Sequence, residues 1–144
     1  MLSLKGLTKS FMGERAVSDV SFDAGEAEIV GLGGQSGSGK STIARCILGL
    51  ERPDQGAIAW QGRPLADRVA RRIARREIQT VFQDPRSSLN PRWTVRRVPS
   101  EPLDNWSGWV AGEDRSARLE ALLRRVSLSP ELLARYPHEL STGQ

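Results

Sequence analysis

Hydrophobic positions divide this 144-residue chain into a first part with the pattern of strands and a second part with the pattern of helices. Residues 2–8, 17–23 and 57–61 have strand-like patterns, and turn-forming residues at 53–56 precede the third run. Residues 27–32 are apolar and β-branched in the middle, which predicts a buried parallel strand. Residues 78–82 predict one more short apolar strand, which ends the first part.

Helical spacing of apolar residues marks two further segments. Residues 42–48 continue at helical intervals directly after a glycine-rich stretch. Residues 113–126 place Leu119, Leu122, Leu123 and Val126 on one face, with acids early and arginines late, as the helix dipole favours. The chain therefore combines strands and helices, with the glycine-rich stretch between a predicted strand and a predicted helix.

That stretch matches the phosphate-binding pattern G-x-x-x-x-G-K-[ST], in the strand-loop-helix context that gives the pattern meaning. The matching residues are Gly34, Gln35, Ser36, Gly37, Ser38, Gly39, Lys40, Ser41 and Thr42. The alternative is a glycine-rich turn without a ligand, and the flanking strand and helix patterns favour a nucleoside triphosphate site.

Each type of residue in the loop has a chemical reason to be there. The glycines allow positive φ and close approach, so that successive N–H groups line a nest around the phosphates. Lys40 would reach the β and γ phosphates as a point charge, and the Ser41 hydroxyl would ligate Mg²⁺. The helix that begins there would point its positive end at the nucleotide.

Two further segments narrow the class of nucleotide-binding protein. Residues 81–91 read Val-Phe-Gln-Asp-Pro-Arg-Ser-Ser-Leu-Asn-Pro, and residues 136–144 read Tyr-Pro-His-Glu-Leu-Ser-Thr-Gly-Gln. With the phosphate loop, in this order, they resemble the ATP-binding subunits of ABC transporters, most specifically those of peptide and nickel importers. The resemblance implies an α/β P-loop NTPase fold of the ABC type, incomplete, with N-terminal β-strands and part of the helical subdomain. Residues 1–83 would be the nucleotide-binding part and residues 84–144 the helical part.

The resemblance also assigns roles to residues outside the loop. Phe11 is similar to the aromatic residue that contacts adenine, and Val17 to an apolar neighbour beneath the base. Gln83 corresponds to the Q-loop glutamine, which touches Mg²⁺ and the attacking water and senses the membrane subunit. An amide suits that role because its oxygen can accept from water or bind a hard cation and release it again.

The segment at residues 140–144 is similar to the ABC signature Leu-Ser-Gly-Gly-Gln. In the family this motif binds the γ-phosphate of ATP held by a second ATPase subunit, which implies that role for Ser141, Gly143 and Gln144. Thr142 departs from the pattern, because a β-branched residue restricts φ and adds bulk where the family has glycine.

In the family, a strand ending in Asp-Glu and a switch histidine follow the signature, and these 144 residues hold neither. We therefore expect an N-terminal fragment that recognises ATP with Mg²⁺ but does not hydrolyse it, from a subunit whose intact form couples ATP hydrolysis to peptide or nickel uptake. The implied partners are a second ATPase subunit and transmembrane permease subunits, on the cytoplasmic side of the cell membrane. Two alternatives stay open: a non-transport ABC ATPase, and a degenerate nucleotide-binding module without catalysis.

Composition adds three points. The net charge is +4, and arginines crowd residues 68–76. Apolar positions four apart and the lack of interleaved aromatics favour a solvated helix over a nucleic-acid site. No segment approaches the length of a membrane span, and the first residues lack the pattern of a signal peptide. Cys46 is expected in the core and His138 as a capping or packing residue, whereas Trp93, Trp106 and Trp109 are candidates either for partner contacts or for core packing.

Overall fold

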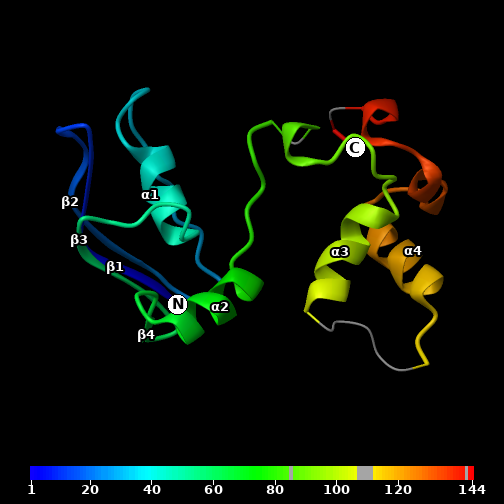
Figure 1. Cartoon of the computed structure of the whole chain (residues 1–144), viewed down its shortest axis with the longest axis horizontal. Coiled ribbons are helices and arrows are strands. Elements are labelled where there is room, and N and C mark those ends of the chain that lie inside the picture. Colours follow the sequence, from blue (N-terminus) through cyan, green and yellow to red (C-terminus); the bar gives the residue numbers. More distant parts are fainter. Residues whose placement is uncertain (85, 107–111, 142) are drawn as a thin grey trace. The chain divides into compact units, whose positions relative to one another are not determined.

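The computed structural model describes residues 1–84, 86–106, 112–141 and 143–144 (Figure 1). They form two compact units, Met1–Gln79 and Thr80–Gln144. Trp109 and Thr142 lie outside the described residues. The functional division expected at residue 83 stays a prediction.

The first unit is built on an antiparallel sheet. Its strands are β1 (Leu2–Phe11), β2 (Glu14–Ala24), β3 (Gln55–Trp60) and the short β4 (Arg63–Pro64), in the order β2-β1-β3-β4. Two-residue turns with positive φ at both positions, 12–13 and 61–62, join β1 to β2 and β3 to β4. Such turns match the twist of paired strands. The strands predicted at 2–8, 17–23 and 57–61 are thus confirmed.

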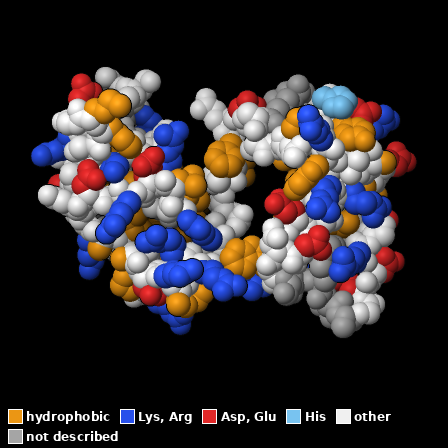
Figure 2. Space-filling view, viewed as in Figure 1, with side chains coloured by type: hydrophobic (Ala, Val, Ile, Leu, Met, Phe, Trp, Pro, Cys, Tyr) orange, Lys and Arg blue, Asp and Glu red, His pale blue; other side chains and the backbone are white. Residues whose placement is uncertain are grey.

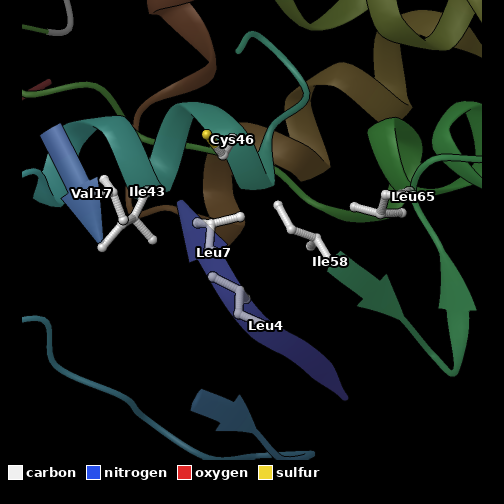
Figure 3. Close-up of a cluster of buried hydrophobic side chains, with 8 residues drawn as sticks. Leu4, Leu7, Val17, Ile43, Cys46, Ile58 and Leu65 are labelled. Carbon is white, nitrogen blue, oxygen red and sulfur yellow. The ribbon is translucent and has the colours of Figure 1, made fainter. Parts of the chain in front are cut away.

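Helix α1 (Lys40–Ile47) packs against this sheet through one apolar stripe. Figure 3 shows Ile43 and Cys46 of α1 among the inward-facing side chains of the strands, near Val17 and Leu7. Cys46 is only 3% exposed, which confirms its predicted core position. The remaining members of this buried cluster are Leu4, Ile58, Leu65 and Ala74.

The strand predictions for residues 27–32 and 78–82 are wrong. Neither segment belongs to a strand, and Ile29 and Val81 are 98% and 93% exposed. The apolar sequence of 27–32 suits a strand within a parallel sheet whose two faces are covered by helices. The described residues provide only the antiparallel sheet, in which neither segment pairs.

Helix α2 (Arg68–Glu77) covers one end of the sheet of the first unit. The side chain of Asp67 caps it by accepting from the Ala70 N–H at 2.7 Å. Ala70 and Ala74 are buried, and Ala74 belongs to the same core cluster as α1. The sequence-based expectation of a surface helix is confirmed for this segment.

The second unit is helical. It contains η1 (Arg86–Ser88), α3 (Arg97–Asn105), α4 (Arg115–Arg125), η2 (Pro130–Ala134) and η3 (Pro137–Glu139). Leu119 and Leu123 of α4 and Leu133 of η2 form its buried centre, with Leu122 packed against it, which confirms these leucines of the predicted apolar face. Val126 was predicted on the same face, but it follows the end of α4 and is 65% exposed. The Val95 and Arg96 N–H groups donate to the carbonyls of Arg135 and Leu133, at 2.8 and 2.9 Å. Among the described residues, no helix is long and apolar enough to cross a membrane.

Candidate nucleotide-binding site

The backbone of the phosphate loop has the positive φ values that its glycines allow. Gly34, Gly37 and Gly39 have φ of 148°, 82° and 87°. Gly39 is the N-cap of α1, and no side chain caps that helix end. The first N–H groups of an α-helix have no partner within the helix, so the start of α1 offers unshared donors beside the loop.

Lys40 places its ammonium group inside the curve of the loop. Its Nζ donates to the carbonyls of Gly34 at 2.8 Å and Gln35 at 2.6 Å, and to the Ser38 hydroxyl at 3.1 Å. The loop itself turns through a bond from the Ser38 N–H to the Gln35 carbonyl, at 3.2 Å. A positive charge thus lies beside exposed N–H donors, which is the combination that a phosphate requires.

Gly39 is also required for packing. A Cβ on this residue would lie 2.2 Å from the Ala16 carbonyl oxygen and 3.1 Å from Val17 Cγ2. Gly37 differs, because a Cβ there would meet nothing within 4 Å. The sequence explained both glycines by backbone freedom near phosphate, whereas the structure shows that Gly39 also allows the loop to lie directly against β2.

The hydroxyl residues of the loop differ in exposure. Ser36, Ser38 and Ser41 are exposed, and Thr42 is half-buried in the first turn of α1. The Ser41 hydroxyl therefore remains open to a ligand at the start of the helix. Within the described residues, no cluster of three or more histidine, cysteine or acidic side chains could hold a metal ion by itself. The binding of Mg²⁺ by Ser41 and Gln83 stays a prediction.

Phe11 ends β1 beside the hairpin turn and is 40% exposed. The Lys9 Nζ lies 5.3 Å from the centre of its ring, so a cation already occupies part of the ring's surroundings. Val17 has a different environment, because it is only 4% exposed and belongs to the core cluster with Ile43. The structure therefore leaves the Phe11 ring available for stacking, and it places Val17 in the core. The contact of either residue with adenine stays a prediction.

An ion pair near Phe11 was not predicted from the sequence. Lys9 Nζ contacts an Asp54 carboxylate oxygen at 3.0 Å, and the other oxygen accepts from the Ser10 N–H at 2.7 Å. These hydrogen bonds, the backbone one first, lower the pKa of Asp54 from its ordinary value of 3.8. The two residues are 45 positions apart, and no local pattern connects them. The pair fixes the end of β1 to the turn before β3.

The other predicted site residues belong to the second unit. Gln83 is exposed, and Ser141 and Gln144 form a small turn of their own. The Ser141 N–H donates to Gln144 Oε1 at 2.9 Å, and the Gln144 N–H donates to the Ser141 carbonyl at 3.1 Å. Gly143 lies within that turn. Their predicted roles toward nucleotide and Mg²⁺ stay predictions.

His138 stacks on Tyr136 at a centroid distance of 5.6 Å, which agrees with a packing role. Trp93 is half-buried, and the guanidinium of Arg97 lies 5.1 Å from its ring centre. Trp106 is also half-buried. Neither observation decides between a core role and a partner contact for the tryptophans.

A cavity of 430 Å³ in the first unit lies away from the phosphate loop. It is lined by residues that include Cys46, Asp54, Ile58, Leu65 and Arg71, and none of residues 34–42 lines it. The candidate site is therefore an open surface formed by the loop and the start of α1, and not this cavity.

Comparison with known proteins decides the family. The family model described as ABC transporter matches residues 17–144. The chain belongs to the ABC transporter family. Its fold is accordingly the α/β P-loop NTPase fold of ABC cassettes, as expected from the phosphate loop and the segments at 81–91 and 136–144.

Curated ABC relatives include peptide and nickel importer proteins. The oligopeptide transport ATP-binding protein OppF of Haemophilus influenzae is 41% identical over 90% of this chain and 40% of its own length. The nickel import ATP-binding protein NikE of Rhodospirillum rubrum is 45% identical over 89% of this chain and 47% of its own length. The chain thus spans somewhat less than half the length of these relatives.

Solved ABC structures have the same fold. The dimeric post-hydrolysis state of the ATP-binding cassette MJ0796, bound to ADP and Pi, matches with a TM-score of 0.83 and 32% identity, over 100% of this chain and 65% of that chain. The cbiO1 protein from Clostridium perfringens, part of the ABC transporter complex cbiONQ, matches with a TM-score of 0.82 and 26% identity, over 99% and 56%.

Proposed function

We propose that this chain binds ATP as part of the ATPase subunit of an ABC importer for peptides or nickel. The observation that carries the proposal is the phosphate loop, where positive-φ glycines, the uncapped start of α1 and the Lys40 ammonium come together. The similarity to OppF, an oligopeptide transport ATP-binding protein, and to NikE, a nickel import ATP-binding protein, supports the substrate class. The intact subunit would couple ATP hydrolysis to uptake.

Within this proposal, Lys40 binds the β and γ phosphates with little rearrangement. Its weakest present acceptor is the neutral Ser38 hydroxyl, at 3.1 Å, and an anionic phosphate oxygen is a stronger acceptor. The bonds to the Gly34 and Gln35 carbonyls would keep the ammonium in the loop during that exchange. The N–H groups at the start of α1 would complete the contact.

Ser41 and Gln83 are the proposed Mg²⁺ ligands. Ser41 has an exposed hydroxyl in the first turn of α1, and Gln83 has an exposed side chain. Hydroxyl and amide oxygens suit a hard cation that keeps several waters. When bound, Mg²⁺ would neutralise phosphate charge. Gln83 would in addition orient the attacking water, which is the reason for proposing it as the catalytic residue.

A second ATPase subunit is the proposed partner of the signature segment. The dimeric state of MJ0796 supports an assembly of two cassettes. Ser141, Gly143 and Gln144 would bind the γ-phosphate held by that second subunit. In this structure the Ser141 N–H donates to Gln144 Oε1, so this hydrogen bond would have to break before the N–H could donate to a phosphate.

Transmembrane permease subunits are the second proposed partner, and they would hold the intact subunit at the inner face of the cell membrane. The cbiO1 protein supports this proposal by analogy, since it is part of a transporter complex. No permease contact is assigned to particular residues of this chain.

Calorimetric titration of the 144-residue chain with ATP and Mg²⁺ tests the proposal. Lys40→Ala should weaken binding at least about tenfold, because charge-assisted hydrogen bonds to phosphate are lost. Lys5→Ala is the matched control, since Lys5 is an exposed lysine on β1 outside the loop. Circular dichroism would verify that both variants fold. Equal affinities of the two variants for ATP would refute the assignment of the loop.

A further inference from the structure

The outward side of α2 carries a concentrated positive charge. The helix holds five arginines and one acid in ten residues. At about 100° per residue, the side chains farthest from buried Ala70 and Ala74 span an arc of about 120°. We call this arc the α2 basic face. Its members are Arg68, Val69, Arg72, Arg75 and Arg76, all of them exposed. Figure 2 shows Lys and Arg side chains gathered over α2.

The two acids next to this face already have partners. Asp67 caps the helix through the Ala70 N–H, and Glu77 accepts from the indole N–H of Trp60. Within the part of the chain that the structure describes, Arg68, Arg75 and Arg76 make no ion pair. Three of the four arginines of the basic face therefore carry a charge that no ion pair among the described residues neutralises.

The charge also weakens the helix that carries it. Arg68, Arg72 and Arg76 follow one another at intervals of four residues, and like charges at that spacing destabilise a helix. Arg71 avoids this face by turning inward, where its guanidinium donates to the carbonyls of Leu65 and Ala66 at 3.0 and 3.3 Å. An anionic surface facing α2 would attract these arginines and so offset the repulsion between them.

We propose that the α2 basic face binds the anionic phospholipid surface of a membrane. This inference rests on the proposed function, which places the protein beside the inner face of a membrane, where anionic lipids are abundant. Guanidinium groups bind phosphate in a bidentate manner, and several arginines on one helix face can contact several headgroups at once.

The composition of the face favours lipid over nucleic acid. Val69 is 66% exposed at the edge of the arginine arc, where it can enter the boundary between headgroups and acyl chains. No aromatic side chain belongs to the face, so it lacks the stacking groups with which proteins bind single-stranded bases. A basic helix with an apolar edge is typical of membrane-surface contacts.

Vesicle flotation on a density gradient tests the proposal, because floating vesicles separate bound chain from aggregates. The probes are neutral phosphatidylcholine vesicles and vesicles with about one third phosphatidylglycerol. We expect binding only to the anionic vesicles, with loss at high salt because exposed charges are screened. Arg68→Glu/Arg76→Glu should lower the partition coefficient at least about 25-fold, from about fivefold for each arginine near an anionic surface.

Arg92→Glu/Arg125→Glu is the matched control, with the same change of charge at two exposed arginines of the other unit. It should lower binding much less than the α2 variant does. Equal losses in the two variants would overturn the proposal, because total charge alone would then explain binding. Absence of flotation in the wild-type chain, equal flotation with neutral vesicles, or selective binding of duplex DNA or RNA would overturn it as well. Circular dichroism would confirm that α2 persists in the variant.

The flotation assay needs neither nucleotide nor permease. A negative result would therefore leave the proposed function intact, and failure of ATP binding in calorimetry would leave a positive flotation result intact. The two proposals are thus distinguishable.

Discussion

Replacing Gly39 with alanine tests whether the loop is held against β2 as the structure shows. The new Cβ would lie 2.2 Å from the Ala16 carbonyl oxygen, and the residue would keep φ of 87°. The left-handed conformation costs an alanine roughly 1–2 kcal/mol. Relief of the overlap adds about 1–3 kcal/mol, as for other overpacked positions. The expected loss of unfolding free energy is therefore about 2–5 kcal/mol, which is a large fraction of the roughly 5–15 kcal/mol that stabilises a typical domain.

Gly37→Ala is the matched control for Gly39→Ala. Gly37 has a similar φ of 82°, but a Cβ there would have nothing within 4 Å. It should lose only the conformational part, about 1–2 kcal/mol. Urea unfolding followed by circular dichroism measures both variants, and the difference between them isolates the contact with Ala16. If both alanine variants lost the same stability, the close contact between loop and β2 would be refuted.

Three further predictions concern the base, the ion pair and turnover. Phe11→Ala should weaken ATP binding by about 1–3 kcal/mol, by analogy with base-aromatic stacking, whereas Phe11→Tyr should retain most of the affinity. Calorimetry would measure both variants. Unchanged affinity in Phe11→Ala would show that Phe11 is a packing residue only. Because the pKa of Asp54 is lowered in the folded chain, its stabilising contribution should be present above the unfolded value and disappear as pH falls through the folded value. Asp54→Asn should therefore reduce the loss of stability at acid pH, as measured by thermal melting across that range, and an unchanged acid slope would contradict the role of this pair. The 144-residue chain should show no ATP turnover that depends on Lys40, and steady phosphate release that Lys40→Ala abolishes would reveal a catalytic carboxylate that has been overlooked.

Local patterns predicted much of the fold. The hairpin strands were found because their apolar positions and turn residues lie close together in the sequence. Helix α4 was predicted from the spacing of Leu119, Leu122, Leu123 and Val126, and the structure buries Leu119 and Leu123 and leaves Val126 exposed. The order of strands, β2-β1-β3-β4, was not predicted, because β3 pairs with β1 across about fifty residues of chain. Pairing at such a distance leaves no local trace in the sequence.

The wrong and missing predictions concern where residues lie in the fold, more than the chemistry of their side chains. Residues 27–32 have the composition of a strand in a parallel sheet with both faces covered, and composition cannot show which strands such a segment pairs with. Lys9 and Asp54 were missed because each looks like an ordinary surface charge. Each residue of the phosphate loop could be named from the sequence, because the motif specifies the residue types of Lys40 and its neighbours within one short stretch of chain. Gly39 was assigned for its backbone freedom, and its contact with Ala16 required the fold.

The hydrogen bonds of Lys40 have a consequence for how the site is kept ready. An ammonium group has three protons, and the three acceptors of Lys40 account for all of them within the loop. The lysine thus joins the carbonyls of Gly34 and Gln35 and the hydroxyl of Ser38 through one ammonium group. Most of the conformational entropy of the loop backbone is then lost during folding, and little more is lost when a ligand binds. A guanidinium, with a planar and wider arrangement of donors, could not reproduce this arrangement, so arginine would be a poor substitute at position 40 despite its equal charge.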